Sequence, residues 1–181
     1  MNASFASNLS QFRAPLSALV GGALLAASLL ACSGPAENDR FGMLTPPRDQ
    51  FAPASEMLGA HCGSLDCHGQ PGRNLRLYHF NGLRLDEVSG AGVTSNAEHE
   101  ANFQSVILLE PEAMFDLVKG GGRNPELLSI VRKARGTEAH KGGKRWTPGD
   151  AADTCFATWL AGAINLDACA AAEEVPRPDF P

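Results

Sequence analysis

The sequence contains few aromatic residues and no excess of basic charge. Among 181 residues it has one Tyr, two Trp and nine Phe, and this scarcity argues against a β-sandwich. Lys and Arg total 15 against 20 Asp and Glu, so the net charge is −5. An acidic chain is a poor candidate for nucleic-acid binding, which usually needs a basic face.

Several motifs of common enzymes are also missing. The glycine run 120–122 is not followed by Gly-Lys-Ser/Thr and trails a predicted helix, so it does not indicate a phosphate-binding loop. No Ser/His/Asp set or carboxylate pair can be argued from spacing, and there is no internal repeat. What is present is a 44% hydrophobic composition, which excludes a mostly disordered chain, at a length that allows one ordinary domain.

The N-terminus predicts an export signal. Residues 14–31 carry no charge, and Arg13 is the only charged residue before them. A basic residue followed by an apolar run is typical of a secretory signal peptide, here residues 1–31. An uncleaved membrane anchor is the alternative, because 18 apolar residues nearly span a bilayer.

The apolar run ends in Leu-Leu-Ala-Cys, with the cysteine at Cys32. This tetrapeptide resembles a bacterial lipobox, which implies that Cys32 is lipidated and becomes the mature N-terminus. The lipid would anchor the chain to a membrane without a spanning helix. Because Ser33 follows, resemblance to Gram-negative sorting implies the outer membrane, facing the periplasm or the exterior of the cell envelope.

Composition divides the mature chain into three parts. Residues 32–50 are rich in Pro, Gly and polar residues and are predicted to be a flexible tether. Residues 51–169 are predicted to be the folded domain. Residues 170–181 contain three prolines and are predicted to be a disordered tail.

The folded part has mainly helical periodicity. An apolar face recurring at positions 54, 57, 58 and 61 predicts a helix leading into Cys62. Residues 96–119 predict two helices divided at Pro111. A further helix is expected from Asn124 to Gly136, and the last from Asp150, with the clearest amphipathic pattern in the chain.

These patterns predict a mainly α fold of four to five short helices joined by long loops. Asn81-Gly82, between two partly alternating arms, is compatible with a small hairpin. Loops this long in a small domain suggest that something other than protein fills part of the core.

The segment from His61 to Gly69 reads His-Cys-Gly-Ser-Leu-Asp-Cys-His-Gly. A c-type haem needs two thiols for thioether bonds and an adjacent imidazole for the iron. Cys62, Cys67 and His68 provide these groups. Four residues separate the cysteines instead of the usual two, so the loop must bulge, and such a variant is known among c-type haem sites.

Three other interpretations of this segment stay open. Cys62 and Cys67 could form a disulfide in an oxidising compartment. They could bind zinc together with His68 and another histidine. They could also be free thiols, which is the least expected state outside the cytoplasm.

The order of motifs resembles the cytochrome c family. A loop over residues 138–150 precedes a capped helix that ends in Trp-Leu-Ala-Gly-Ala at 159–163. Gly-Leu-Arg-Leu-Asp at 82–86 is similar to a stretch in cytochrome-c-like modules of large bacterial surface and periplasmic proteins. The resemblance covers residues 51–165 and implies a cytochrome c-like bundle.

The resemblance also implies the roles of individual residues. Cys62 and Cys67 would attach haem c, and His68 would be the proximal iron ligand. His140 stands where many cytochromes place a distal Met, so it is the candidate sixth ligand, unless it is simply a solvent-exposed loop residue. Met114 could serve instead, although its helical spacing favours core packing, as it does for Met57.

The remaining histidines and cysteines have simpler predictions. His61 is expected to cap or pack, and His79 and His99 lie in polar contexts that predict exposure. Cys155 and Cys169 predict a disulfide, unless Cys155 is a buried free thiol. Closing that loop of about 15 residues would stabilise the fold by roughly 3 kcal/mol.

The sequence therefore predicts a lipid-anchored haem protein that transfers single electrons between redox partners, rather than an enzyme that transforms a substrate. The alternatives are a haem-free structural or interaction lipoprotein with a Cys62–Cys67 disulfide, and a zinc-stabilised binding module.

Overall fold

A computed structural model describes residues 42–85 and 94–174. The predicted signal peptide, the lipobox with Cys32 and most of the predicted tether lie outside these residues. Within the described residues the fold is mainly helical, as predicted, with six α-helices and no β-strand. None of the described helices has the length and apolar character needed to cross a bilayer.

Side-chain caps mark the start of several described helices. The elements are η2 (Arg48–Gln50), α2 (Phe51–Cys62), α3 (Asn96–Ile107), α4 (Pro111–Lys119), η3 (Pro125–Leu127), α5 (Ser129–Arg135), α6 (Ala151–Leu160) and α7 (Leu166–Glu173). Ser95 and Glu98 form a reciprocal capping box on α3, and the Asp150 side chain accepts from the Asp153 amide to begin α6. Pro111 begins α4, as predicted.

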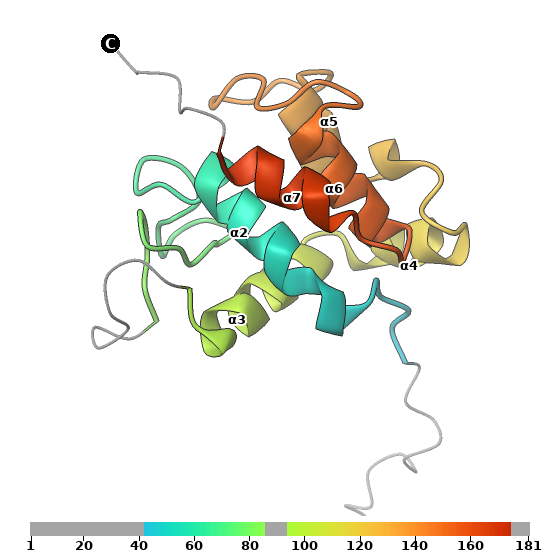
Figure 1. The fold of residues 1–181 in the computed structure, drawn as a ribbon, viewed down its shortest axis with the longest axis horizontal. Coiled ribbons are helices and arrows are strands. Elements are labelled where there is room, and N and C mark those ends of the chain that lie inside the picture. Colours follow the sequence, from blue (N-terminus) through green and yellow to red (C-terminus); the bar gives the residue numbers. More distant parts are fainter. Residues whose placement is uncertain (1–41, 86–93, 175–181) are drawn as a thin grey trace, which may run out of the picture. The chain divides into compact units, whose positions relative to one another are not determined.

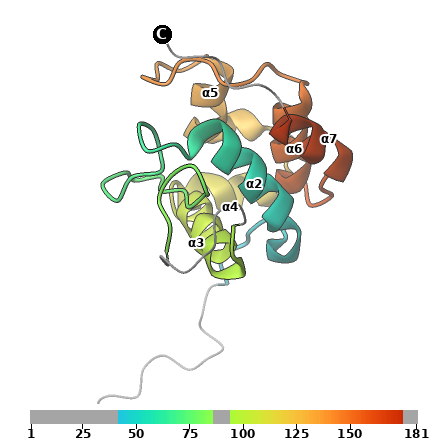
Figure 2. The ribbon, with the colours of Figure 1, turned by 60° about the vertical axis from the view of Figure 1, so that its left-hand side comes forward.

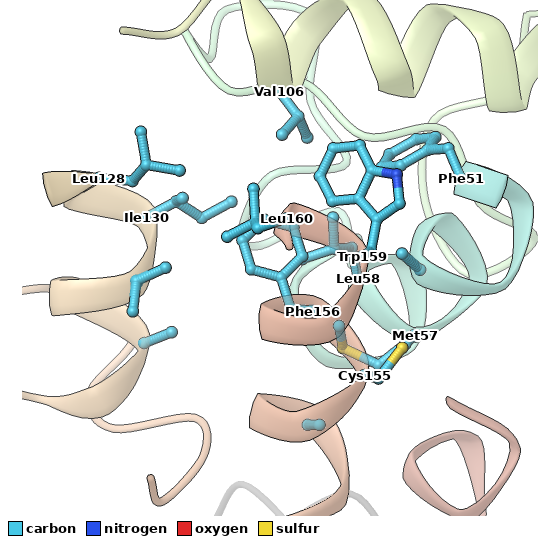
Figure 3. Packing of buried hydrophobic residues seen from close by; sticks show 14 of the residues in the cluster. Phe51, Met57, Leu58, Val106, Leu128, Ile130, Cys155, Phe156, Trp159 and Leu160 are labelled. Atoms are coloured by element: carbon cyan, nitrogen blue, oxygen red, sulfur yellow. The ribbon is translucent and has the colours of Figure 1, made fainter. Parts of the chain in front are cut away.

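Helix α2 lies at the centre of the packing, in contact with α3, α6 and α7 (Figures 1 and 2). Phe51 is 1% exposed, and its ring centroid lies 4.7 Å from that of Trp159 on α6. Phe156 packs on the other side of Trp159 at 5.5 Å (Figure 3). The core is therefore aromatic where α2 meets α6, although the chain has few aromatic residues.

Helix α7 was not predicted. The sequence analysis placed a disordered tail from residue 170, but α7 continues to Glu173. The Asn165 side chain caps the helix by accepting from the Ala168 amide at 2.9 Å, and Cys169 and Ala172 are buried. Because α7 also packs on α2 and α6, this segment belongs to the folded domain.

The predicted tether likewise ends earlier than expected. Residues 48–50 form η2, and the Pro47 carbonyl accepts from Trp159 Nε1 at 2.9 Å. The Gln50 side chain accepts from the Ile164 amide at 3.2 Å. These long-range hydrogen bonds hold residues 47–50 against the domain, so the boundary predicted at residue 51 is a few residues too late.

The hairpin hypothesis is wrong. A single bridge joins Tyr78 and Leu83, and the Gly82 amide donates to the His79 carbonyl in a turn. Asn102 on α3 instead accepts from the Tyr78 amide and donates to its carbonyl, at 2.7 and 2.9 Å. A buried helix side chain thus satisfies the backbone groups that a second strand would have paired.

The expected helix over 124–136 is interrupted. Residues Pro125–Leu127 form η3, Leu128 is extended, and α5 begins at Ser129. The Glu110 carboxylate accepts from the Ser129 amide at 2.6 Å, which fixes the new start. Gly136 ends α5 with a φ of 75°, as its glycine predicts.

Candidate functional site

The Cys62–His68 loop follows directly from the end of α2. Cys62 is the last residue of that helix, and its carbonyl accepts from the His68 amide at 2.9 Å. The amides of Cys67 and Gly69 both donate to the Ser64 carbonyl at 2.9 Å. The four residues between the cysteines therefore bulge within a closed, hydrogen-bonded turn, as the sequence analysis required.

Three glycines allow this turn to pack tightly. A Cβ atom on Gly69 or on Gly82 would overlap the Gly63 carbonyl oxygen. A Cβ on Gly63 would lie 2.7 Å from the Gly59 carbonyl oxygen. Only glycine leaves enough space at position 69, directly after His68. The same holds for Gly82, whose turn lies against this loop.

Cys62 and Cys67 are both partly buried free thiols. Burial raises the pKa of the Cys62 thiol to about 12, although Arg145 acts in the opposite direction. A thiol with a pKa this high is scarcely ionised at neutral pH, and only the thiolate is a strong nucleophile. Cys62 in this state is poorly suited to thiol–disulfide exchange.

His68 is held in one tautomer. Its Nδ1 lies 2.9 Å from the Leu75 carbonyl oxygen, which can only accept, so Nδ1 carries the proton and Nε2 keeps its lone pair. Burial lowers the pKa of His68, so the neutral form is favoured. A neutral imidazole whose other nitrogen donates to a backbone carbonyl is the usual form of a metal-ligating histidine.

His140 lies opposite His68. The two ring centroids are 5.8 Å apart and the ring planes differ by 18°. His140 Nδ1 makes a long contact of 3.4 Å with the Gly143 carbonyl, and Gly142 leaves room for the ring. The structure thus brings together the two histidines that the sequence analysis singled out, from positions 72 residues apart.

Two pockets meet at this histidine pair. One, of about 340 Å³, extends from Cys62 toward α5 and Trp146. The other, of about 470 Å³, lies along Cys67 and the loop at Lys141. Both are lined by His68 and His140, and each has the volume of a typical cofactor cleft.

Two polar atoms at the first pocket have no hydrogen-bond partner among the described residues. They are Arg145 Nε and Trp146 Nε1, both buried. Buried donors are nearly always satisfied, so an unpaired one calls for an explanation such as a missing ligand. An arginine and an indole are donors only, so the matching group is an acceptor such as a carboxylate.

The other predicted site residues have clear outcomes. Cys155 and Cys169 form the predicted disulfide, which joins α6 to α7. Met57 and Met114 are buried in the core, at 0% and 1% exposure, as their spacing indicated. His61 Nε2 lies 2.9 Å from the Ala172 carbonyl, a packing role, while Cys32 lies outside the described residues.

The prediction that His79 and His99 are exposed is wrong. His79 is 2% exposed, the His99 side chain is 16% exposed, and both contact Glu56. A usable signal was present, because Leu75, Leu77 and His79 alternate along the chain and all three are buried. The polar neighbours of both histidines concealed this.

Comparisons with protein-family models, with curated proteins and with solved structures give no match. Among the described residues, no group of three or more His, Cys, Asp or Glu side chains is arranged to hold a metal ion. The zinc hypothesis therefore has no complete donor set there. A haem requires only one or two protein ligands, because its porphyrin supplies the rest.

Proposed function

We propose that the protein is a cell-envelope lipoprotein that carries one covalently attached c-type haem and transfers single electrons between partner proteins. The observation that carries the proposal is the histidine pair beside two free thiols. His68 is fixed by the Leu75 carbonyl and faces His140 across 5.8 Å. The proposal includes a cytochrome c-like arrangement of the helices.

The two rings lie close enough for both histidines to line one ligand site. Their centroids are 5.8 Å apart and their planes differ by 18°. Both side chains also line the two pockets. A disulfide-only module would give no reason for these two rings to face each other.

The two thiols and the unpaired donors of Arg145 and Trp146 also support a haem at this site. Cys62 and Cys67 are close to His68 in sequence, on one closed turn, and are not joined to each other. Arg145 and Trp146, which line the same pocket as Cys62, offer two unpaired donors. A haem carries both vinyl groups, across which a thiol S–H can add to form a thioether, and carboxylates, which these donors can bind.

When bound, haem supplies an iron that gains or loses one electron. The protein would hold it by the thioether sulfurs of Cys62 and Cys67. The imidazoles of His68 and His140 would set the reduction potential, because replacing a thioether ligand by imidazole usually lowers it. Trp146 and Ile130, at 3% and 8% exposure, would keep water from the buried side.

The envelope location rests on the sequence alone. Lipidation of Cys32 would hold the domain at a membrane surface, and residues 33–46 would give it reach. The redox partners are proteins that donate and accept one electron each. No nucleic acid is expected as a partner.

The first test is the visible spectrum of the protein made in a periplasm equipped for cytochrome c maturation. We expect sharp α and β bands after dithionite reduction, and haem that stays on the chain in a denaturing gel. A colourless protein would overturn the proposal. The remaining possibilities would be a haem-free module with a Cys62–Cys67 disulfide and a module in which these cysteines bind a metal ion. Thiol titration before and after reduction identifies the disulfide, and loss of the metal to a chelator identifies the metal site.

Ligand variants sharpen the assignment. His68→Ala should abolish low-spin haem, whereas His140→Ala should retain covalent haem and open the sixth position, giving a high-spin spectrum. His99→Gln is the control, because His99 contacts Glu56 and lines neither of the two pockets. An unchanged spectrum in His68→Ala would contradict the ligand assignment.

A further inference from the structure

A groove of about 590 Å³, here called the Arg76 groove, lies between residues 74–78 and α3. The side chains at positions 75 and 77 are buried in the core. Because side chains alternate along an extended segment, Asn74, Arg76 and Tyr78 lie on its other side, and all three line the groove. One wall of the groove is therefore polar and carries a positive charge.

Helix α3 and its C-cap form the other wall. Ala101, Gln104, Ser105 and Leu108 all line the groove. Their spacing of three, four and seven positions places them on one side of a helix. Leu108, the C-cap residue, is 57% exposed. This wall is thus polar in its middle and apolar at its end.

Hydrogen bonds hold the two walls together. Ser105 Oγ accepts from the Arg76 amide at 2.7 Å. The Asn102 side chain accepts from the Tyr78 amide at 2.7 Å and donates to the Tyr78 carbonyl at 2.9 Å. The groove is therefore preformed, and a ligand would not have to order its walls on binding.

Arg76 is the one charged side chain that lines the groove. Its Nε is buried and has no hydrogen-bond partner among the described residues. An arginine nitrogen can only donate, and a buried donor is nearly always paired, so this position calls for an acceptor.

The other arginines show how unusual this state is. Apart from Arg145 at the histidine site, each of the other described arginines donates to a carboxylate or a backbone carbonyl. They are Arg48, Arg73, Arg84, Arg123, Arg132 and Arg135. Arg76 is therefore left for an acceptor from outside the chain.

No acidic side chain of the described residues lines the groove. Glu100 contacts Gln104 in the wall, but its two oxygens already accept from Arg48 Nε at 2.6 Å and from Gln104 Nε2 at 2.9 Å. The charge of Arg76 is thus not neutralised within the groove, which favours an anion there.

The chemistry of the walls narrows the class of anion. A carboxylate has two planar acceptors, which match the fork of donors on a guanidinium. Leu108 and Leu109 add an apolar surface beside that charge, and covering it with an alkyl group removes apolar area from water. A carboxylate with an apolar tail satisfies both parts of the groove.

We propose that the Arg76 groove binds a small monocarboxylate with a short alkyl tail: Arg76 holds the carboxylate, and Leu108 packs on the tail. The site needs no haem. It adjoins the pocket beside His68, because Asn74 and Leu109 line both hollows, but it has its own arginine.

The proposal is tested by a chemical-shift titration of the full chain with hexanoate and with acetate. The readout is the amides of Ser105 and Tyr78. We expect hexanoate to bind about tenfold more tightly than acetate, because its four additional methylene groups partly leave water in an open groove. Equal affinities, or no shift of these amides, would overturn the proposal. Inorganic phosphate is the third probe, and binding as tight as that of hexanoate would overturn the assignment to a monocarboxylate.

Variants of Arg76 test the anion contact. Arg76→Gln should weaken hexanoate binding by at least about tenfold, because a hydrogen-bonded charge is lost. Arg76→Lys should give an intermediate affinity, since it keeps the charge but not the fork. Arg123→Gln is the matched control, because Arg123 donates to the Gly120 carbonyl in its own loop and does not line the groove. Unchanged affinity in Arg76→Gln would contradict the proposal.

Two more variants locate the tail and the site. Leu108→Ala should reduce the advantage of hexanoate over acetate and leave acetate binding unchanged. Arg145→Gln should leave the shifts of the Ser105 amide intact. If Arg145→Gln abolished these shifts and Arg76→Gln did not, the carboxylate would bind at the histidine site and the groove would be refuted. Unchanged amide signals far from the groove show that each variant is folded.

Discussion

Two tryptophans mark two differently built regions of the molecule. Trp159, on α6, is fully buried, and its Nε1 donates to the Pro47 carbonyl at 2.9 Å. Trp146, in the loop before α6, is 3% exposed, yet its Nε1 has no partner among the described residues. The same side chain is thus satisfied in the helical core and unsatisfied beside the histidine pair.

This contrast extends to the surroundings of each tryptophan. The α2–α6–α7 region has aromatic packing and a disulfide, and it makes long-range hydrogen bonds to residues 47–50. The region around His68 and His140 consists of loops, contains two pockets and leaves Arg145 Nε unpaired as well. The first region is held by packing and paired hydrogen bonds, whereas the second combines two pockets with two unpaired buried donors.

The largest effect is expected from Trp159→Ala. The indole packs on Phe51, Phe103 and Phe156, so its removal leaves a cavity at the centre of the core. Truncating a buried aromatic lowers the free energy of unfolding by about 3–5 kcal/mol. Urea unfolding followed by circular dichroism measures it. A loss below about 1 kcal/mol would mean that the core does not depend on α6 as described.

The disulfide is the second way to test the helical core. Replacing Cys155 and Cys169 by Ser together removes the bond that joins α6 and α7 across 14 positions in sequence. The chain-entropy model gives a loss of roughly 3 kcal/mol for a loop of this size. In the wild type, the difference between the unfolding midpoints with and without reductant measures the contribution of the disulfide. Midpoints that do not respond to reductant would argue that the bond is absent.

The helical core was the part most readily predicted from the sequence. Helix α6 has an Asp cap and a continuous apolar face, and both signals are local. Helix α7 escaped prediction because its stability comes from packing on α2 and α6, and its alanine-rich sequence has no strong periodicity. The hairpin prediction failed for a similar reason, since Asn102 on another helix takes the hydrogen bonds of Tyr78.

The candidate site was predicted from residue identity rather than from pattern. The spacing of Cys62, Cys67 and His68 pointed to the loop, and the resemblance pointed to His140. Nothing in the sequence placed the two imidazoles 5.8 Å apart, because that distance depends on the path of the 136–146 loop, whose Arg145 and Trp146 amides donate to the Ala134 carbonyl on α5. The contacts of Glu56 with His79 and His99 were missed because they join residues from three separate segments.

A smaller effect is expected from Gly82→Ala, which tests the tight packing of the loop region. The new methyl group would overlap the Gly63 carbonyl oxygen, so the turn after Cys62 must shift. Overpacking of this kind lowers the free energy of unfolding by about 1–3 kcal/mol. Gly72→Ala is the matched control, since nothing lies within 4 Å of a Cβ there. Equal stability of the two variants would show that the loop adapts.

The smallest effect on stability is expected from Trp146→Phe, and its sign distinguishes the two regions. In protein without a ligand, the change removes an unpaired buried N–H and keeps most of the ring packing against Phe156. The gain from losing the unpaired donor offsets the lost volume, so the free energy of unfolding should stay within about 1 kcal/mol of wild type. In haem-loaded protein, the same change should lower the midpoint of thermal unfolding, because the indole would then have an acceptor. If the substitution instead destabilised the apoprotein and left the haem-loaded protein unaffected, Trp146 would be a core residue like Trp159.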